Sequence, residues 1–593
     1  MDTSAKLASL RGLMLERGID AYVITGGDAH INDRMADYWR ARAWFSGFTG
    51  SAGTVVVTAS EAGVWTDGRY FVQAEQELAG SGITLYKEGE PGVPKYEDFV
   101  LDKLPKNGKL GFDGRTMSAA AFDTLKEKLR DKTFHYHEDL VGMIWTNRPP
   151  LSSAPAFEHL PNFAGLSAAE KLQNVRAKMI ENKIDAYLVT ALDNIAWLLN
   201  IRGNDIDNTP VVYSYALITN KDAFVFIDSN KVADISGKLT SQGFTLENYD
   251  AVAEKLSTLP RDINIYYNQG KTNVSLALEI PNKPDKNSKD IITHLKGVKS
   301  EIELKNIRNA YIKEGVAMVK LLKWVDDNIS ANKEFCENDV ETILKVFRKE
   351  QEYYLRDSFD TIAAYGENAA LPHYKHTGDG ATIKPEGFLL IDAGGQYLDG
   401  TTDTTRTVVV GSITDEMRRD FTLVLKGHIA FSQAIFLENT TGHALDMLAR
   451  QPVLAGLKNY NHGTGHGIGY CLGVHEGPQS VAARNVDVAL VPGMILSNEP
   501  GIYEPGRYGI RIENILAVQK LCKNTHGAFL NFENLTYTPY DMRAVDVSLL
   551  TCGEIEFINS YHKKVYETLS PRLSEDEQKW LKKVTMPVGN CAI

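Results

Sequence analysis

A twenty-residue segment occurs twice in the first third of this chain, and this repeat constrains the fold more than any other feature. Residues 6–25 read KLASLRGLMLERGIDAYVIT, and residues 171–190 read KLQNVRAKMIENKIDAYLVT. The two segments align without a gap at an offset of 165, with ten of twenty positions identical. Each has apolar residues at helical spacing followed by a short apolar run, which predicts a helix and then a strand. The repeat therefore predicts two related α/β domains.

Two breaker-rich segments predict the domain boundaries. Residues 147–155 contain three prolines and end the first copy, and the polar residues 281–290 end the second. The predicted domains span residues 1–155, 156–297 and 298–593. The third begins at Ser300 and Glu303, which have the spacing of a helix capping box. An apolar stripe follows at helical spacing, and we interpret it as a core face; it consists of Leu304, Ile307, Tyr311, Met318, Leu322 and Val325.

Composition excludes several classes of protein. The net charge of -12 argues against a nucleic-acid partner, which normally requires a basic surface. No stretch of about 18 uninterrupted apolar residues predicts a membrane span, and the N-terminal residues lack the pattern of a signal peptide. The five cysteines are scattered without a CxxC pair, which favours free thiols in a reducing compartment. We therefore expect a cytoplasmic protein with neither nucleic-acid nor membrane partners.

Two aspartates mark the segment DAGGQYLDGTTDTTRT, residues 392–407. Asp392 ends an apolar strand, and Asp403 begins a strand that is expected to return antiparallel to it. Carboxylates at the ends of buried strands are costly unless they are paired or bind a metal. Taken alone, however, both could be ordinary turn aspartates beside glycines.

Three histidines lie in the glycine-rich segment HGTGHGIGYCLGVHEGP, residues 462–478. Glycine lets the backbone approach a ligand closely, and histidine is a common metal ligand and proton carrier. A nucleotide-binding loop is a weaker interpretation, because no Lys-Ser/Thr pair follows the glycines. The density of His462, His466 and His475 favours a functional site over ordinary polar histidines.

Two glutamates complete the set of candidate ligands. Glu499 lies in NEPG, residues 498–501, after a short apolar run. Glu513 lies in RIEN, residues 511–514, where Arg511 and Glu513 alternate with isoleucines. This period of two predicts one strand over residues 510–518, with Arg511 and Glu513 on the same face. A solvent-facing Arg/Glu face is the alternative.

Together these signals predict a dinuclear metal hydrolase. The ligand set of four carboxylates and one imidazole consists of Asp392, Asp403, His466, Glu499 and Glu513. Such oxygen-rich ligands suit Mn²⁺, Co²⁺ or Zn²⁺ better than copper or an iron–sulfur cluster. Four acids exceed what a single zinc requires, whereas carboxylates can bridge two ions roughly 3.5 Å apart. Two such cations would also offset the negative charges and make hydroxide available near neutral pH.

The motifs resemble those of one superfamily. DGTTDTTRT, HGTGHGIG, VHEGP, NEPGIY and RIEN occur in this order, preceded by SGFTGSAGT and WTDGRYF near the N-terminus. Over essentially the whole chain they resemble the creatinase/aminopeptidase P superfamily, and within it the three-domain, soluble Xaa-Pro aminopeptidases. The resemblance implies two creatinase-like N-terminal α/β domains followed by a pita-bread metallopeptidase domain with a C-terminal extension, in a chain that forms a homodimer.

The resemblance also implies how the metals are held. Asp403 and Glu513 would bridge two divalent ions, most plausibly Mn²⁺ with Zn²⁺ or Co²⁺ as alternatives. Asp392 would hold one ion, and His466 and Glu499 the other. Hydroxide between the ions would attack the first peptide bond, with Glu499 as general base.

Further residues are implied as substrate contacts. His373 and His475 would hydrogen-bond the scissile carbonyl or its oxyanion, and His462 would line the pocket for the residue after the bond. Arg511 and Tyr503 match positions close to the site. Residues 375–380 depart from the family pattern, which leaves substrate preference open. Arg69 could contribute from the N-terminal domains, although a turn arginine is the simpler interpretation.

The predicted activity is metal-dependent hydrolysis of the N-terminal Xaa-Pro bond of peptides with proline in the second position. Proline forms a tertiary amide with a fixed φ, so general peptidase clefts fit it poorly. A prolidase, which cleaves Xaa-Pro dipeptides, is the main alternative, but prolidases resemble two-domain chains without the duplication. Methionine aminopeptidases are shorter. Neither creatinase nor the non-catalytic pita-bread binding modules use these five ligands.

Overall fold

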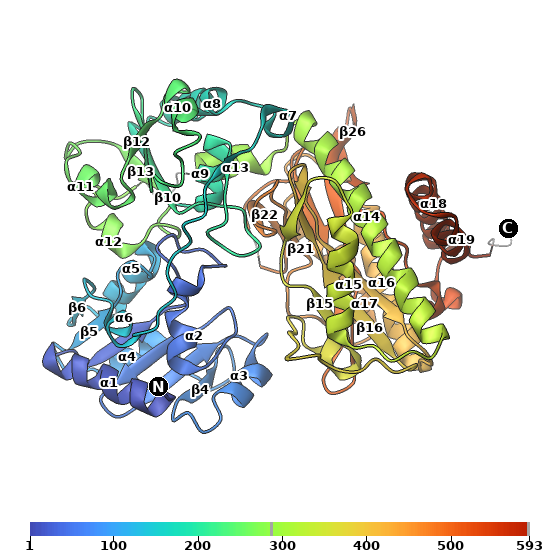
Figure 1. Ribbon diagram of the computed structural model, residues 1–593, viewed down its shortest axis with the longest axis horizontal. Helices are drawn as coiled ribbons and strands as arrows, with labels where there is room; N and C mark the ends of the chain where they lie inside the picture. Colours follow the sequence, from blue (N-terminus) through green and yellow to red (C-terminus); the bar gives the residue numbers. More distant parts are fainter. Residues whose placement is uncertain (285–288, 485, 590–593) are drawn as a thin grey trace. The chain divides into compact units, whose positions relative to one another are not determined.

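The computed structural model describes residues 1–284, 289–484 and 486–589. Part of the predicted boundary segment 281–290 and Cys591 lie outside these residues. The chain forms two compact units, the first made of residues 1–159 and 166–292 and the second of residues 160–165 and 293–593 (Figure 1). The bounds of the three domains proposed from the sequence stay predictions.

The repeated segment forms the same local structure twice in the first unit. In the first copy, helix α1 (Thr3–Glu16) leads to strand β1 (Ala21–Ile24). In the second, helix α8 (Ala168–Glu181) leads to strand β8 (Ala186–Val189). Both helices bury their apolar faces, and both strands are buried along their whole length. The predicted helix and strand are therefore confirmed in each copy.

The two sheets of this unit share a pairing pattern. The first sheet has the order β4-β3-β2-β1-β5-β6, and the second has the order β12-β11-β10-β8-β13. Strand β1 pairs antiparallel with β2 and parallel with β5, whereas β8 pairs antiparallel with β10 and parallel with β13. The sequence repeat thus corresponds to a repeat of topology. The remaining strands are β2 (Thr54–Thr58), β3 (Ala62–Thr66), β4 (Thr84–Lys87), β5 (Lys109–Phe112), β6 (Thr133–His135), β10 (Ser214–Thr219), β11 (Ala223–Ile227), β12 (Thr245–Glu247) and β13 (Ile265–Tyr267).

A long helix organises the second unit. Helix α14 (Glu301–Ser330) begins at the predicted capping box, in which Ser300 and Glu303 bond each other's backbone N–H groups. It packs against α15 (Glu337–Lys349), α18 (Cys552–Leu569) and α19 (Glu575–Val584) (Figure 1). Its apolar stripe is buried as predicted. Among the helices of the described residues, none has the length and hydropathy needed to cross a membrane.

The strands of the second unit form two main sheets. One has the order β15-β16-β19, and the other has the order β20-β27-β26-β23-β21-β22. The antiparallel pair expected at Asp392 and Asp403 is present as β16 with β19, and β23 pairs antiparallel with β26. Their bounds are β15 (Ile362–Tyr365), β16 (Phe388–Ala393), β19 (Thr404–Val409), β20 (Phe436–Leu437), β21 (Gly465–Gly467), β22 (Glu476–Val481), β23 (Ile495–Asn498), β26 (Asn514–Asn524) and β27 (Gly527–Asn534).

One strand prediction is wrong. The continuous strand expected over residues 510–518 is interrupted, because β25 (Tyr508–Arg511) ends before β26 begins at Asn514. Strand β25 forms a hairpin with β24 (Gly501–Glu504), whereas β26 joins the six-stranded sheet. At the interruption, the backbone N–H of Glu513 donates to the carbonyl oxygen of Thr405. The alternating isoleucines extend across the point where the backbone changes from pairing with β24 to pairing with β23. A periodic pattern alone does not reveal such a change.

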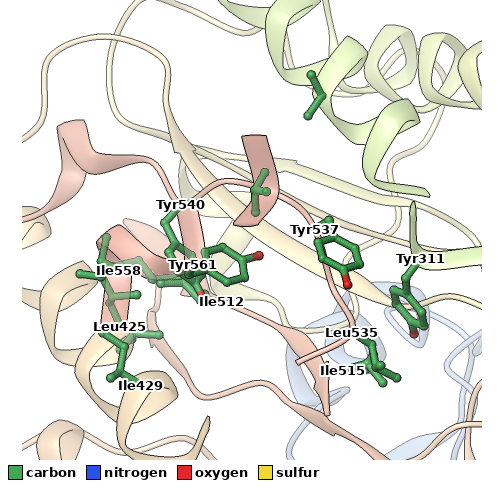
Figure 2. Packing of buried hydrophobic residues seen from close by; sticks show 14 of the residues in the cluster. Tyr311, Leu425, Ile429, Ile512, Ile515, Leu535, Tyr537, Tyr540, Ile558 and Tyr561 are labelled. Atoms are coloured by element: carbon green, nitrogen blue, oxygen red, sulfur yellow. The ribbon is translucent and has the colours of Figure 1, made fainter. Parts of the chain in front are cut away.

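An aromatic and aliphatic core packs the C-terminal helices onto the second unit. The rings of Tyr540 and Tyr561 stack with centroids 4.5 Å apart. Leu425 of α16 (Asp415–Ser432) and Ile558 of α18 lie beside them (Figure 2). This packing joins α18 to the elements that carry the candidate ligands.

The expectation of free thiols holds for only part of the cysteines. Cys336 and Cys522 carry free thiols. Cys552, at the start of α18, is disulfide-bonded, so the prediction is wrong at this position. The odd count and wide spacing of the cysteines gave no signal for this bond.

The buried Arg406 of β19 connects several parts of the second unit. Its guanidinium donates to the carbonyl oxygens of Glu513 and Thr538 at 2.7 and 2.6 Å, and to the hydroxyl of Tyr561 at 2.9 Å. A planar guanidinium with five N–H groups can serve such divergent acceptors, whereas a lysine ammonium cannot. Arg406 therefore joins β19 to the residues beside β26 and to α18.

We expect Arg406→Lys to lower the free energy of unfolding by about 3 kcal/mol, because several buried acceptors lose their donor. Urea unfolding followed by circular dichroism measures this change. Arg507→Lys, at a half-exposed side chain in the same unit, serves as the control and is expected to have little effect. An unchanged unfolding midpoint for Arg406→Lys would contradict the role given to this side chain.

Candidate metal centre and active site

Neighbouring strands bring the two candidate aspartates to the same end of a sheet. Asp392 lies in β16 opposite Thr405 of β19, and Asp403 directly precedes β19. The backbone N–H of Asp403 donates to the hydroxyl of Tyr311 at 3.2 Å. Tyr311 was interpreted from the sequence as a core residue only. It is buried, but it also fixes the backbone of a candidate ligand.

Three further strand ends bring the remaining candidates to the same place. His466 lies in β21, Glu499 follows β23, and Glu513 lies between β25 and β26. One potential ligand atom each from Asp403, His466 and Glu513 lie within 4.8 Å of one another. His466 Nε2 is also 3.4 Å from Glu499 Oε1. Side chains up to 110 positions apart in the sequence thus converge on one small volume.

Asp392 faces the same cluster. Its Oδ2 accepts a hydrogen bond from Arg511 Nη2 at 2.6 Å, whereas its Oδ1 is buried and has no hydrogen-bond partner among the described residues. The charge of Asp392 contributes to the raised pKa values of Asp403, Glu499 and Glu513. A buried carboxylate oxygen without a donor is costly unless a cation binds it.

Burial and mutual repulsion disfavour the charged forms of these acids. Burial and then the charge of Glu513 raise the pKa of Asp403 well above its usual range. Burial raises the pKa of Glu513 to about 8, with Glu499 and Asp392 adding to the shift. Burial, opposed by Arg511 and reinforced by Asp392, raises the pKa of Glu499 to about 8. Without a bound cation, the cluster therefore retains protons near neutral pH.

An unprotonated ring nitrogen of His466 faces the acidic side chains. Its Nδ1 lies 3.0 Å from the carbonyl oxygen of Gly467, which can only accept, so Nδ1 carries the proton. Burial lowers the pKa of His466, which favours the neutral ring. Nε2 therefore directs a lone pair towards the carboxylates, the arrangement that metal-binding histidines adopt. Divalent metal ions fit this site for three reasons. One Asp392 oxygen has no hydrogen-bond partner among the described residues, the acids lie close together, and the lone pair of His466 Nε2 faces them.

A second set of side chains forms a hydrogen-bond chain beside the acids. Arg511 Nη1 donates to the hydroxyl of Tyr503 at 2.8 Å. The Tyr503 hydroxyl lies 2.8 Å from Nε2 of His462, and His462 Nδ1 lies 2.8 Å from the carbonyl oxygen of Gly463. Burial and the charge of Arg511 lower the pKa of His462 to about 3, so its ring is neutral. The chain therefore runs from Arg511 through Tyr503 to His462.

The two remaining candidate histidines border this centre. The ring of His475 lies edge-on to that of His466, with centroids 4.4 Å apart. Its neighbour Glu476 is buried and accepts hydrogen bonds from the buried ammonium groups of Lys296 and Lys299. His373 follows Pro372, whose carbonyl oxygen lies 3.4 Å from Arg511 Nη2. All ten candidate residues lie in the second unit.

Arg69 lies in the first unit, where it pairs with Asp67 of its own turn at 2.7 Å.

Two hydroxyl side chains that contact the candidate ligands were not identified from the sequence. Ser497 accepts from the backbone N–H of His466 at 3.0 Å and donates to Glu499 Oε1 at 3.2 Å. Thr405 donates to Glu513 Oε2 at 2.8 Å. Each lies two positions from a candidate ligand along an extended segment, a spacing that places side chains on one face. This period of two was the signal that could have identified them.

Comparisons with known proteins agree with this arrangement. The profile of metallopeptidase family M24 matches residues 305–520, and that of its C-terminal region matches residues 528–588. Two profiles of the creatinase/prolidase N-terminal domain match residues 6–144 and 147–303. Aminopeptidase P2 of Arabidopsis thaliana is 37% identical over 98% of this chain and 88% of its own length.

The chain belongs to metallopeptidase family M24. A probable Xaa-Pro aminopeptidase P of Coprinopsis cinerea is 36% identical, with 99% of both chains covered. The crystal structure of an X-prolyl aminopeptidase from Caenorhabditis elegans, described as a cytosolic enzyme with a di-nuclear active site, superposes with a TM-score of 0.94. It is 33% identical and covers 99% of this chain and 100% of its own. The predicted superfamily, fold class and hydrolase activity of this M24 chain are thereby confirmed.

For the metal-free M24 chain, we expect the free energy of unfolding to fall as the pH rises from about 7 to about 8.5. Glu499 and Glu513 have folded-state pKa values raised from 4.5 to about 8, so the folded state binds more protons than the unfolded state in this range. Their stabilising contribution is complete below pH 4.5 and is lost as the pH passes about 8.

Urea unfolding of chelator-treated protein at several pH values measures this effect. Glu513→Gln should flatten the dependence, and saturating divalent metal should do the same because the ions replace the protons. A metal-free stability that stays constant or rises over this range would contradict the expected protonation of the cluster.

Proposed function

We propose that this M24 chain is an Xaa-Pro aminopeptidase that hydrolyses the bond between an N-terminal residue and a following proline, using two divalent metal ions. The observation that carries the proposal is the convergence of two buried and two half-buried carboxylates and one neutral imidazole beside three further histidines. The full-length similarity to relatives named as Xaa-Pro aminopeptidases supports the choice of substrate.

The proposed ligands are those expected from the sequence: Asp392, Asp403, His466, Glu499 and Glu513. Asp403 and Glu513 would be the shared ligands, as the resemblance implies, and one oxygen of each lies within 4.8 Å of the other and of a His466 ring nitrogen. When bound, two such cations offset the carboxylate charges and make hydroxide available at neutral pH. We propose Mn²⁺ as the natural ion, since hard oxygen ligands predominate, with Zn²⁺ and Co²⁺ as alternatives.

Glu499 is the proposed proton carrier. Its carboxylate lies at the edge of the cluster, 3.4 Å from His466 Nε2, and Ser497 holds one of its oxygens. It would accept a proton from the attacking water and donate it to the proline nitrogen as the peptide bond breaks. This transfer balances the reaction, because the leaving imino nitrogen must gain a proton.

The histidines are the proposed groups that bind the reacting carbonyl and the proline. His475 and His373 would donate hydrogen bonds to the carbonyl oxygen as it gains negative charge, an effect that is often the largest in catalysis. The neutral His462, held by Tyr503 and Arg511, would line the pocket for the proline ring. Proline offers no N–H donor, so a weakly polar ring wall suits it.

A prolidase remains the alternative to be tested, although the duplicated N-terminal sheets speak against it. We expect metal-stripped protein to be inactive and to release arginine from Arg-Pro-Pro after Mn²⁺ is added back. Parallel additions of Zn²⁺ and Co²⁺ rank the ions. Hydrolysis of an Xaa-Pro dipeptide without hydrolysis of Arg-Pro-Pro would contradict the proposal and favour a prolidase.

A ligand variant connects this activity to the cluster. We expect Asp403→Asn to lose metal by elemental analysis and to lose nearly all turnover of Arg-Pro-Pro, because a shared ligand is removed. Asp415→Asn, at the exposed start of α16, is the matched control. Parental metal content and turnover in Asp403→Asn would exclude the proposed centre.

We also propose a homodimer in the cytoplasm. Exposed apolar side chains on or beside β20 and β26, namely Ile435, Leu437 and Leu521, offer surface that a second copy could cover. Sedimentation equilibrium should give twice the chain mass of 65.8 kDa. A monomer mass at micromolar concentration would exclude the dimer, and recovery in the membrane fraction of the source cells would exclude the location.

A further inference from the structure

Glu337, the first residue of α15, is fully buried and lies outside the metal centre. Its Oε1 accepts from the backbone N–H of Tyr365 at 2.8 Å and from Asn368 Nδ2 at 2.9 Å. Its Oε2 accepts from the hydroxyl of Tyr374 and from the backbone N–H of Ala381, both at 2.8 Å. Burying a polar group is costly unless it is hydrogen-bonded, and here four neutral donors supply the bonds of one buried carboxyl group.

The four donors share one location in the chain. They all belong to the segment of residues 365–381, which includes the 3₁₀ helix η3 (Gly366–Ala370) and carries His373. Tyr365 and Ala381 are the two ends of this segment, and Tyr374 is adjacent to His373. One carboxylate therefore closes the segment into a loop and also holds the residue next to the candidate oxyanion histidine.

Close backbone contacts hold the same loop from both sides. Gly380 has a φ of 71°, and a Cβ there would lie 2.5 Å from Glu337 Oε2, so a side chain is excluded. On the other side, a Cβ on Gly509 of β25 would lie 1.7 Å from the carbonyl oxygen of Ala369. Pro372 approaches Arg511 through its carbonyl oxygen. His373 thus lies between a contact to the active-site arginine and a contact to Glu337.

We propose that Glu337 is a positioning residue for the reaction, which acts by holding the loop so that His373 reaches the scissile carbonyl. The inference rests on the role given to His373 in the proposed function and adds to it the group that fixes this histidine. A displacement of about 1 Å at a catalytic group can lower the rate by two orders of magnitude. A loop that holds His373 in place therefore helps to keep the rate of hydrolysis high.

The isosteric variant Glu337→Gln separates this role from the capping of α15. A glutamine amide keeps one acceptor oxygen but replaces the other with a donor, so at least one bond from a backbone N–H is lost and the side-chain partner beside it must reverse its role. Tyr374→Phe removes the Glu337 bond beside His373, together with the bond that Asn368 Nδ2 donates to the same hydroxyl, and leaves both loop ends attached. Glu350→Gln is the matched control, since this carboxylate at the C-terminal end of α15 pairs with Lys320 instead.

Steady-state hydrolysis of Arg-Pro-Pro by the Mn²⁺-loaded full chain tests the proposal. We expect Glu337→Gln to lower kcat by about tenfold or more, with KM and metal content within twofold of the parent. Tyr374→Phe should lower kcat by about threefold to fivefold, and Glu350→Gln should leave it unchanged. In a His373→Ala background, neither Glu337→Gln nor Tyr374→Phe should lower kcat further, because the group that they position is gone.

Several outcomes would overturn the proposal. Effects that multiply fully with His373→Ala would show that Glu337 acts independently of His373, and lost metal would indicate a general structural role. If Glu337→Gln does not fold, an unchanged kcat in Tyr374→Phe decides against the inference. A parental kcat in His373→Ala would instead refute the proposed role of His373, and absence of all peptide hydrolysis in the parent would refute the proposed function itself.

Discussion

Electrostatic repulsion among four clustered carboxylates, two of them buried and two half-buried, is the constraint on which the rest of this molecule depends. Asp392, Asp403, Glu499 and Glu513 would separate or take up protons if the surrounding structure were free to relax. Each is attached to a different strand end, so no local motion can relieve the repulsion. The fold therefore holds the acids in a cluster that attracts positive charge. Divalent cations can compensate the negative charges of this cluster more completely than protons can.

The cations of the protein itself are arranged so that they do not neutralise this cluster. Arg406 lies between the segments of Asp403 and Glu513, yet its guanidinium donates to backbone carbonyls, an amide oxygen and a hydroxyl. Arg511 pairs with Asp392 through a single oxygen and leaves the other oxygen without a donor. One arginine thus fixes the scaffold and the other orients a ligand, while the space among the acids remains available for metal ions.

The sequence predicted those features that depend on residue type and short-range spacing. The repeat, the capping box at Ser300 and the ligand set could all be identified in this way, because helix caps and strand alternation are local properties. The break before β26 could not, since it depends on a backbone bond to Thr405 more than 100 positions away. Glu337 reads as an ordinary acidic residue in the first turn of a helix, and Glu476 shows no relation to Lys296 or Lys299, about 180 positions earlier. Such long-range polar pairings leave no periodic trace in a sequence.

The closed loop of residues 365–381 has a consequence for how its sequence can change. Its ends and the neighbour of His373 are attached to Glu337, whereas residues 375–379 lie between these attachments, are mostly exposed and are held by other side chains, with His376 bonded to Glu341 and Lys375 to Asp360. The exposed side chains of this stretch make none of the four bonds to Glu337, and none of them is a candidate metal ligand. The stretch can therefore vary in sequence while the bonds that hold the loop and the cluster of acids stay constant.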